Sequence, residues 1–185
     1  MDPMSGTHIA FYRFVRIDDV DAVCARLRAL ADGLLGTVLV ATEGVNGMLA
    51  APSERIEEFV SAAACDPLLS TAFDGMVYKR TAYERIPFSR TLIKAKREIV
   101  PLGVDGLDMP ARVDDVAATD VPPHEWRELI RRDDVVVLDN RNSFEFGVGR
   151  FKGAVDPGVV NFRDFRDYVE QHAPQWKAEG KQVAM

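Results

Sequence analysis

A run of four aliphatic residues, followed at once by charged ones, most constrains how this chain folds. Residues 135–138 cannot alternate between a core and water, so they predict a strand buried on both faces, as in a parallel α/β sheet. Asp139 follows the run directly, and Arg141 and Glu145 come soon after it. Ligands of open α/β sheets bind beyond the carboxyl ends of the strands, so we expect these charges to border a site. A plain strand end with a solvated ion pair is the alternative.

The segments around this run predict one half of an α/β domain over residues 122–185. Two prolines at 122–123 favour a helix start, residues 162–169 have helical apolar spacing, and residues 180–185 begin a second strand. No later helix follows to cover the sheet, so we expect the chain to be an N-terminal portion of a longer protein. The alternatives are a short final strand at a sheet edge, or a partner that supplies the cover.

Residues 1–100 predict a separate α+β domain, joined to the second by a proline-bearing, acidic linker at residues 101–121. Its expected elements are a strand at 9–15, a helix capped by Asp18 or Asp19, strands at 37–41 and 47–50 with a turn between them, a helix capped by Ser53, and a strand at 76–80. This order is that of the ferredoxin-like plan, an antiparallel sheet with two helices on one face. Cys24 falls in the first helix's apolar stripe and predicts a buried, inert thiol.

Positive charge gathers near the end of this domain. Residues 76–100 hold seven Lys or Arg and two Glu, a net charge of +5 in a chain whose total is -6. The candidate RNA-phosphate contacts are Lys79, Arg80, Arg90, Lys94, Lys96 and Arg97. Tyr78, Tyr83 and Phe88 lie nearby in sequence and could stack on bases. A sheet edge protected by Lys and Arg is the alternative explanation.

Composition excludes several other classes. The 185 residues contain no apolar run of membrane-spanning length, and residues 1–6 lack the basic and apolar regions of a secretory signal. Two cysteines do not make a disulfide framework, so a reducing cytoplasm is the expected compartment. His8, His124 and His172 have no partner at metal-ligand spacing, and we expect no metal site.

Three separated stretches, at residues 36–47, at 94–103 and at 138–145 with 151–154, together resemble the bacterial rhodanese-related family of tRNA uridine hydroxylases. The resemblance covers essentially the whole chain. It implies an acylphosphatase-like (ferredoxin-like) N-terminal domain followed by an incomplete rhodanese-like α/β domain. It also implies a tRNA substrate, and dioxygen as the co-substrate that hydroxylates carbon 5 of the wobble uridine. Any further cofactor is unknown.

The same resemblance limits what this chain can do alone. In that family a strand corresponding to residues 183–185 leads into a loop that carries a cysteine, whose thiolate the surrounding backbone N–H groups would favour. Cys24 and Cys65 both belong to the first domain, so the expected nucleophile lies beyond Met185 and the chain alone should be inactive. Asp139, Arg141 and Glu145 are then scaffold residues of the pocket, with Glu145 as the ion-pair partner. Bracing of the loop without contact to substrate is the alternative role.

Two departures and two rival functions accompany this resemblance. Asn140 stands where the family usually has an aliphatic residue, and Arg150 where rhodaneses often have histidine. The rhodanese features alone would fit a sulfurtransferase that passes a persulfide sulfur to a small acceptor. If the natural protein ended at Met185, a non-enzymatic RNA- or protein-binding module would be the better prediction.

Overall fold

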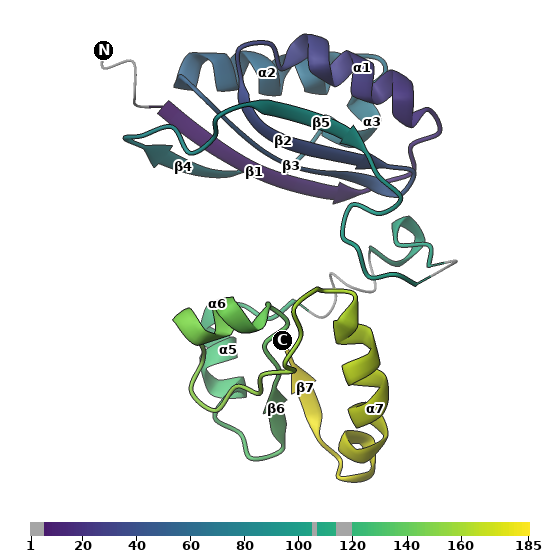
Figure 1. Ribbon diagram of the computed structural model, residues 1–185, viewed down its shortest axis with the longest axis vertical. Coiled ribbons are helices and arrows are strands. Elements are labelled where there is room, and N and C mark those ends of the chain that lie inside the picture. Colours follow the sequence, from purple (N-terminus) through teal and green to yellow (C-terminus); the bar gives the residue numbers. More distant parts are fainter. Residues whose placement is uncertain (1–5, 105–106, 114–119) are drawn as a thin grey trace. The chain divides into compact units, whose positions relative to one another are not determined.

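The computed structural model describes residues 6–104, 107–113 and 120–185, and the chain divides into two compact units (Figure 1). The first unit comprises Met1–Val100 and Gly106–Asp114, and the second comprises Pro101–Asp105 and Asp115–Met185. Within the described ranges, no helix is both long enough and apolar enough to cross a lipid bilayer.

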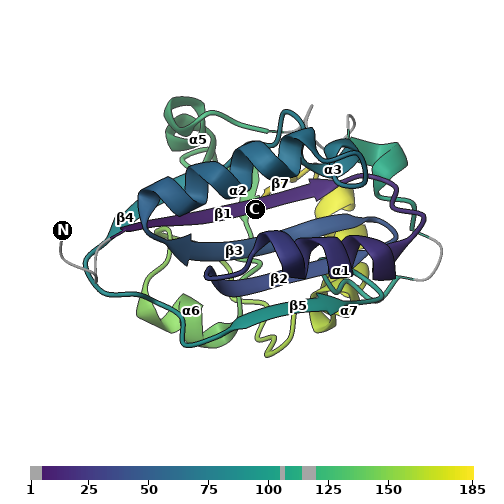
Figure 2. The ribbon, with the colours of Figure 1, turned by 90° about the horizontal axis from the view of Figure 1, so that it is seen from above.

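The first unit is a five-stranded sheet with its helices on one face (Figures 1 and 2). Its elements are β1 (Gly6–Phe14), α1 (Val20–Leu30), β2 (Leu35–Ala41), β3 (Gly44–Ala51), α2 (Ser53–Cys65), α3 (Ser70–Phe73), β4 (Lys79–Tyr83), β5 (Thr91–Ala95) and the 3-10 helix η1 (Pro110–Arg112). The strand order is β4-β1-β3-β2-β5, with β5 parallel to β2 and the other pairings antiparallel. Strands β1 to β4 have the predicted ferredoxin-like order, and β5 is an addition to it.

The two long helices of this unit begin in different ways. The Asp19 carboxylate accepts a hydrogen bond from the Ala22 backbone N–H at 2.8 Å, which confirms Asp19 as the cap of α1. The prediction for Ser53 was wrong, because Pro52 precedes the helix and Ser53 is its first residue. The Ser53 hydroxyl instead lies 2.8 Å from the Thr7 hydroxyl of β1. Cys24 is buried, as predicted.

Two strand predictions were displaced. The turn between β2 and β3 spans only residues 42–43, because residues 44–46 pair with β1 and β2 and so belong to β3. The strand expected at 76–80 begins at Lys79. Met76 precedes it and packs into the core from an irregular segment, so its apolar character reflects burial rather than a strand.

The core of the first unit lies between the sheet and its helices. Ile9 and Phe11 of β1 meet Phe59 of α2 and Phe73 of α3 there, all at most 4% exposed. The Phe11 and Phe73 rings are 5.7 Å apart, and the Phe59 and Phe73 rings are 6.1 Å apart, both edge-to-face. This is a favoured arrangement of packed aromatic rings.

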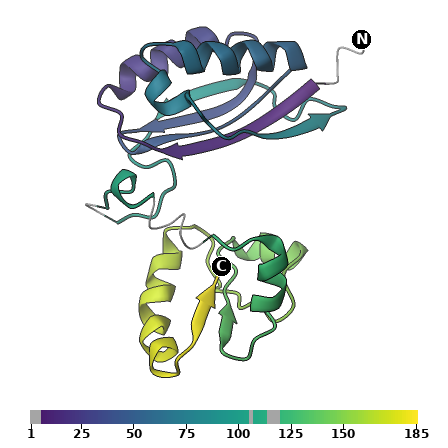
Figure 3. The same cartoon turned by 180° about the vertical axis from the view of Figure 1, so that it is seen from behind.

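The second unit contains a small parallel sheet (Figure 3). Its elements are α5 (Pro123–Leu129), β6 (Val135–Val137), α6 (Ser143–Val148), α7 (Asp164–Ala178) and β7 (Gln182–Ala184). β6 pairs with β7, and Leu138 continues the strand by bridging to Val155 on the other side. Val137 and Leu138 are buried, but Val135 and Val136 are only half-buried, so the predicted burial on both faces holds only at the end of the run.

Candidate functional site

A pocket of about 470 Å³ opens at the carboxyl end of the second unit's sheet. It is lined by Trp126, Val137, Leu138, Asp139, Asn140, Arg141, Gly149, Arg150, Phe151, Ala154 and Met185. β6 and β7 are parallel and both end here, which is where open α/β sheets place ligands. Two of the three charged residues that the sequence singled out therefore line one cavity.

Backbone hydrogen bonds on both sides of β6 fix the floor of this pocket. The Leu138 N–H donates to the Ala184 carbonyl at 2.8 Å, and the Asp139 N–H donates to the Val155 carbonyl at 3.0 Å. These two bonds fix the backbone position of Asp139, which carries the first carboxylate of the site. The Asp139 side chain is 7% exposed.

Asp139 and Arg141 form a two-pronged ion pair. The Arg141 Nε–H donates to Asp139 Oδ1 at 2.8 Å and its Nη2 donates to Oδ2 at 2.6 Å. Nη2 also donates to the Gly149 carbonyl at 2.7 Å, which ties the loop after α6 to the strand end. The hydrogen bonds from Arg141 hold the pKa of the Asp139 carboxyl below its ordinary value, and the carboxylate in turn raises the pKa of Arg141.

Glu145 does not pair with Arg141, contrary to the sequence prediction. Asn142 is the N-cap of α6: its side-chain oxygen accepts from the Glu145 backbone N–H at 3.0 Å, and its amide nitrogen donates to the Glu145 carboxylate at 2.6 Å. This reciprocal contact resembles a capping box and fixes Glu145 at the helix start. Its negative charge still contributes to the raised pKa of Arg141.

The sequence did not identify the walls of the pocket. Trp126 of α5 and Phe151, which follows α6, lie with ring centroids 5.5 Å apart. Arg150 lies with its guanidinium 4.6 Å from the centre of the Phe146 ring, and its Nη1 donates to the Phe146 carbonyl. Trp126 and Phe151 both lie more than ten positions from Asp139 in the sequence, so no local pattern connected them with the strand end.

Neither cysteine lies at this pocket. Cys24 and Cys65 both belong to the first unit, where burial raises the pKa of the Cys24 thiol. Among the described residues, no group of three His, Cys, Asp or Glu side chains is placed to hold a metal ion. Asp139 and Arg141 therefore offer binding and charge, and no nucleophilic sulfur.

The predicted RNA-binding residues lie on the two opposite edges of the first unit's sheet. On the β4 edge, Lys79 is opposite Ala10 and Arg80 is opposite Ile9, so the two cations face opposite sides. Arg80 lies on the helix side and forms an ion pair with Glu57 of α2.

The other four cations lie in or beside β5, the edge strand next to β2. Lys94 is within the strand, Arg90 precedes it, and Lys96 and Arg97 follow it; all four side chains are exposed. Both basic groups therefore occupy edge strands, as the alternative of protected edges predicts. Their role in RNA binding stays a prediction.

Two of the three aromatic residues expected to stack on bases, Tyr78 and Phe88, are engaged within the protein. Tyr78 packs edge-to-face on Phe11 at 5.4 Å on the core side, and burial raises the pKa of its phenol to about 12. Phe88 lies 5.6 Å from the His8 ring. The described structure leaves Tyr78 and Phe88 little freedom to receive a base.

Comparison with known proteins places the chain in a family. The family described as "UPF0176 acylphosphatase like domain" matches residues 6–99. Proteins named tRNA uridine(34) hydroxylase are 40% identical over 179 residues in Mesorhizobium japonicum and 39% identical over 181 residues in Acinetobacter baylyi. Each match covers 95% of this chain, and 54% and 53% of the respective relatives. The chain thus spans about half the length of the curated relatives it matches.

Solved structures give more distant similarities. The dark-state BLUF protein BlrB is similar with a TM-score of 0.40 and 16% identity, over 69% of this chain and 95% of its own. An acylphosphatase from Bacillus subtilis is similar with a TM-score of 0.34 and 16% identity, over 49% of this chain and 99% of its own. The family match covers the whole sheet of the first unit. The chain belongs to the UPF0176 family, and its first unit is an acylphosphatase-like α+β domain.

Proposed function

We propose that this chain is part of a tRNA-modifying enzyme that hydroxylates carbon 5 of the wobble uridine with dioxygen. The observation that supports this most is the similarity, at 35–40% identity over nearly the whole chain, to proteins named tRNA uridine(34) hydroxylase. In this proposal the second unit is half of a rhodanese-like domain, consistent with its parallel strands and the pocket at their carboxyl ends.

The pocket has properties that suit an extruded nucleotide. Enzymes that act on a base take it out of its stack into a cavity, and ligand cavities commonly measure about 300–1,000 Å³. The cavity of about 470 Å³ falls in that range, with Trp126 and Phe151 as apolar walls. A base would lie against these rings, above the floor formed by Asp139.

Arg141 is the residue we assign to the anionic part of the substrate. Its Nε and Nη2 hydrogens bind Asp139 and the Gly149 carbonyl, whereas within the described part of the chain no hydrogen bond uses Nη1. The side chain is 42% exposed, so the Nη1 N–H groups are available to a phosphate oxygen. The proposal gives this chain binding and pocket-shaping roles and no catalytic nucleophile, so the 185-residue chain alone should not hydroxylate uridine.

Deletion of the gene that encodes this chain tests the proposal. Mass spectrometry of nucleosides from total tRNA should show loss of 5-hydroxyuridine and its derivatives, and the intact gene should restore them. Arg141→Lys should restore them poorly, because an ammonium cannot make the two-pronged contact to Asp139. Lys152→Ala, outside the pocket lining, is the matched control. Unchanged 5-hydroxyuridine in the deletion strain would refute the proposal, and thiosulfate-to-cyanide turnover would instead indicate a sulfurtransferase.

A further inference from the structure

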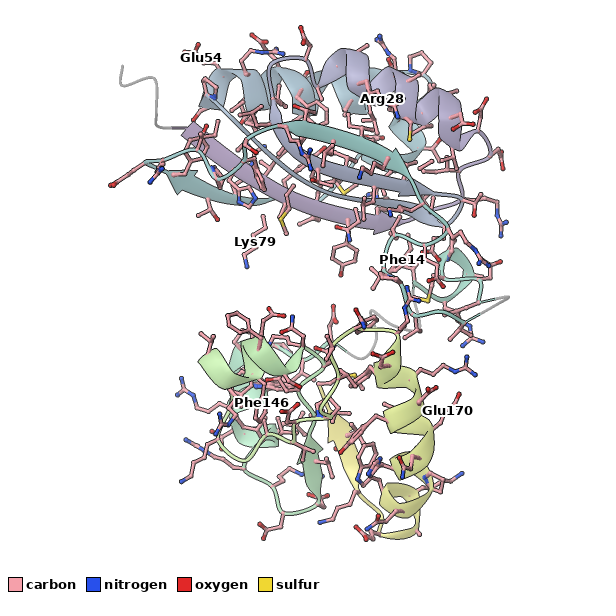
Figure 4. The ribbon with its side chains drawn as sticks, in the orientation of Figure 1. Phe14, Arg28, Glu54, Lys79, Phe146 and Glu170 are labelled. Atoms are coloured by element: carbon pink, nitrogen blue, oxygen red, sulfur yellow. The ribbon has the colours of Figure 1, made fainter. Side chains whose placement is uncertain are left out.

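The face of the first unit's sheet that the helices leave uncovered carries two neighbouring aromatic side chains. Ile9 and Phe11 point into the core beneath the helices, so the alternating residues Tyr12 and Phe14 belong to the other face. Figure 4 shows Phe14 projecting on the side away from α1 and α2. Tyr12 is 66% exposed, and its ring lies 6.2 Å from that of Phe14 in an edge-to-face arrangement.

Strand register extends this surface across the whole sheet. Tyr12 is opposite Asn46 of β3, Asn46 is opposite Leu39 of β2, and Leu39 is opposite Lys94 of β5. In the neighbouring row, Ala10 lies between Lys79 of β4 and Met48 of β3, whose side chain is 48% exposed. We call this surface the open face; its main residues are Tyr12, Phe14, Asn46, Met48, Lys79 and Lys94.

The open face has cations at both edges and no carboxylate on its strands. None of the five strands contains Asp or Glu, although the chain has 29 such residues. Four strand spacings separate Lys79 from Lys94, about 19 Å. Within the described residues neither lysine forms an ion pair. Glu43 lies in the turn between β2 and β3, and its carboxylate accepts a hydrogen bond from the Ile99 backbone N–H at 2.7 Å.

Ordered segments cover the two ends of the open face and define its free centre. Phe88 packs on His8 at one end. At the other, the Asn46 side-chain amide donates to the Ile99 carbonyl at 3.0 Å. The uncovered part is therefore the strip around Tyr12 and Met48, with a lysine at either side.

We propose that the open face binds a single-stranded stretch of RNA, with a base stacked on Tyr12, whose ring packs against the half-buried Phe14, and with backbone phosphates at Lys79 and Lys94. Aromatic side chains on a sheet can stack two or three unpaired bases, whereas the bases of a duplex are already stacked on one another. The positive edges match a phosphodiester backbone. That the single strand comes from tRNA, whose anticodon loop is unpaired, rests on the proposed function.

Fluorescence anisotropy with the 185-residue chain and a labelled single-stranded oligoribonucleotide tests this assignment. Tyr12→Ala should weaken binding about tenfold, the typical effect of losing one base-stacking ring, and Tyr12→Phe should retain it. Phe144→Ala removes an aromatic ring that is even more exposed, at 79%, from the second unit and is the matched control. Lys79→Ala and Lys94→Ala should each lower the slope of log affinity against log salt by about 0.7. Far-UV circular dichroism verifies that each variant is folded.

Three outcomes would overturn the inference. Tyr12→Ala could bind as tightly as the Phe144→Ala control, or a duplex of the same sequence could bind as tightly as the single strand. Alternatively, Tyr12→Ala could leave RNA binding intact and change the sedimentation of the chain, which would make the open face a protein contact. Loss of binding in Tyr12→Ala combined with unchanged 5-hydroxyuridine in the gene deletion would refute the proposed function and support the open face.

Discussion

The two units bury their apolar side chains to very different extents. Among the described residues, the main core cluster of the first unit contains 21 buried side chains, and that of the second contains three. Phe144 and Val148 of the second unit are 79% and 77% exposed. We infer that apolar burial stabilises the first unit, whereas polar contacts such as the Asp139–Arg141 pair carry more of the second unit's local order.

Removal of a large core side chain should have the largest effect and should separate the units. Phe59→Ala is expected to destabilise the first unit by about 3–5 kcal/mol, because it empties a fully buried site between α2 and the sheet. Trp126 and Trp176, the chain's two tryptophans, belong to the second unit, so their fluorescence during urea unfolding reports that unit. The variant should shift the unfolding transition seen by circular dichroism and leave the fluorescence transition in place.

A matched variant sharpens this test. Leu138→Ala in the second unit, at a residue that is 1% exposed, should move the fluorescence transition instead. If either substitution moved both transitions together, the units would unfold as one cooperative body and the comparison between them would fail.

Loss of the pocket carboxylate should have an intermediate effect. Asp139→Asn removes the charge that binds Arg141 at two points, and we expect a cost of about 1–3 kcal/mol to the second unit because the replaced group is buried. Asp134→Asn, in the exposed pair with Arg132, is the control and should have a much smaller effect. Equal urea midpoints for the two variants by tryptophan fluorescence would show that the Asp139–Arg141 pair is no more important than a surface pair.

Acid should produce the smallest and most specific effect. The folded-state pKa of Asp139 lies below its ordinary value of 3.8, so the stabilisation from its ionised form is fully present above that value and is lost as the pH falls through the depressed pKa. We therefore expect the fluorescence-detected stability to fall below about pH 4. The stability of the Asp139→Asn variant should fall less steeply with decreasing pH than that of the wild type. Parallel pH profiles would exclude Asp139 as a source of the acid sensitivity.

Local patterns made most of the first unit's elements predictable, and long-range contacts explain what was missed. Helical spacing and the Asp19 cap identified α1 because both depend on neighbouring residues. The pairing of β5 with β2 joins residues 55 positions apart, and a five-residue strand carries no signal for its partner. Alternation along β1 does place Tyr12 on the other face of the sheet from Phe11, so the sequence already contained a signal for the open face.

At the candidate site, the sequence indicated the position but not the contacts. A buried run followed by charge located Asp139 and Arg141 at a strand end, and both line the pocket. The attachment of Arg141 to the Gly149 carbonyl and the engagement of Glu145 by Asn142 depend on how α6 folds back. Neither spacing nor composition determines that geometry.

The fifth strand also determines how short the first unit can be made. A chain truncated at Phe88 would retain β1 to β4 but would expose the backbone of β2, which carries no charged residue between Leu35 and Ala41. Such a bare apolar strand can add a strand from another copy, so the truncated protein would self-associate. Solubility of this domain therefore depends on keeping residues up to Ile99, which also anchors the end of the sheet through Glu43 and Asn46.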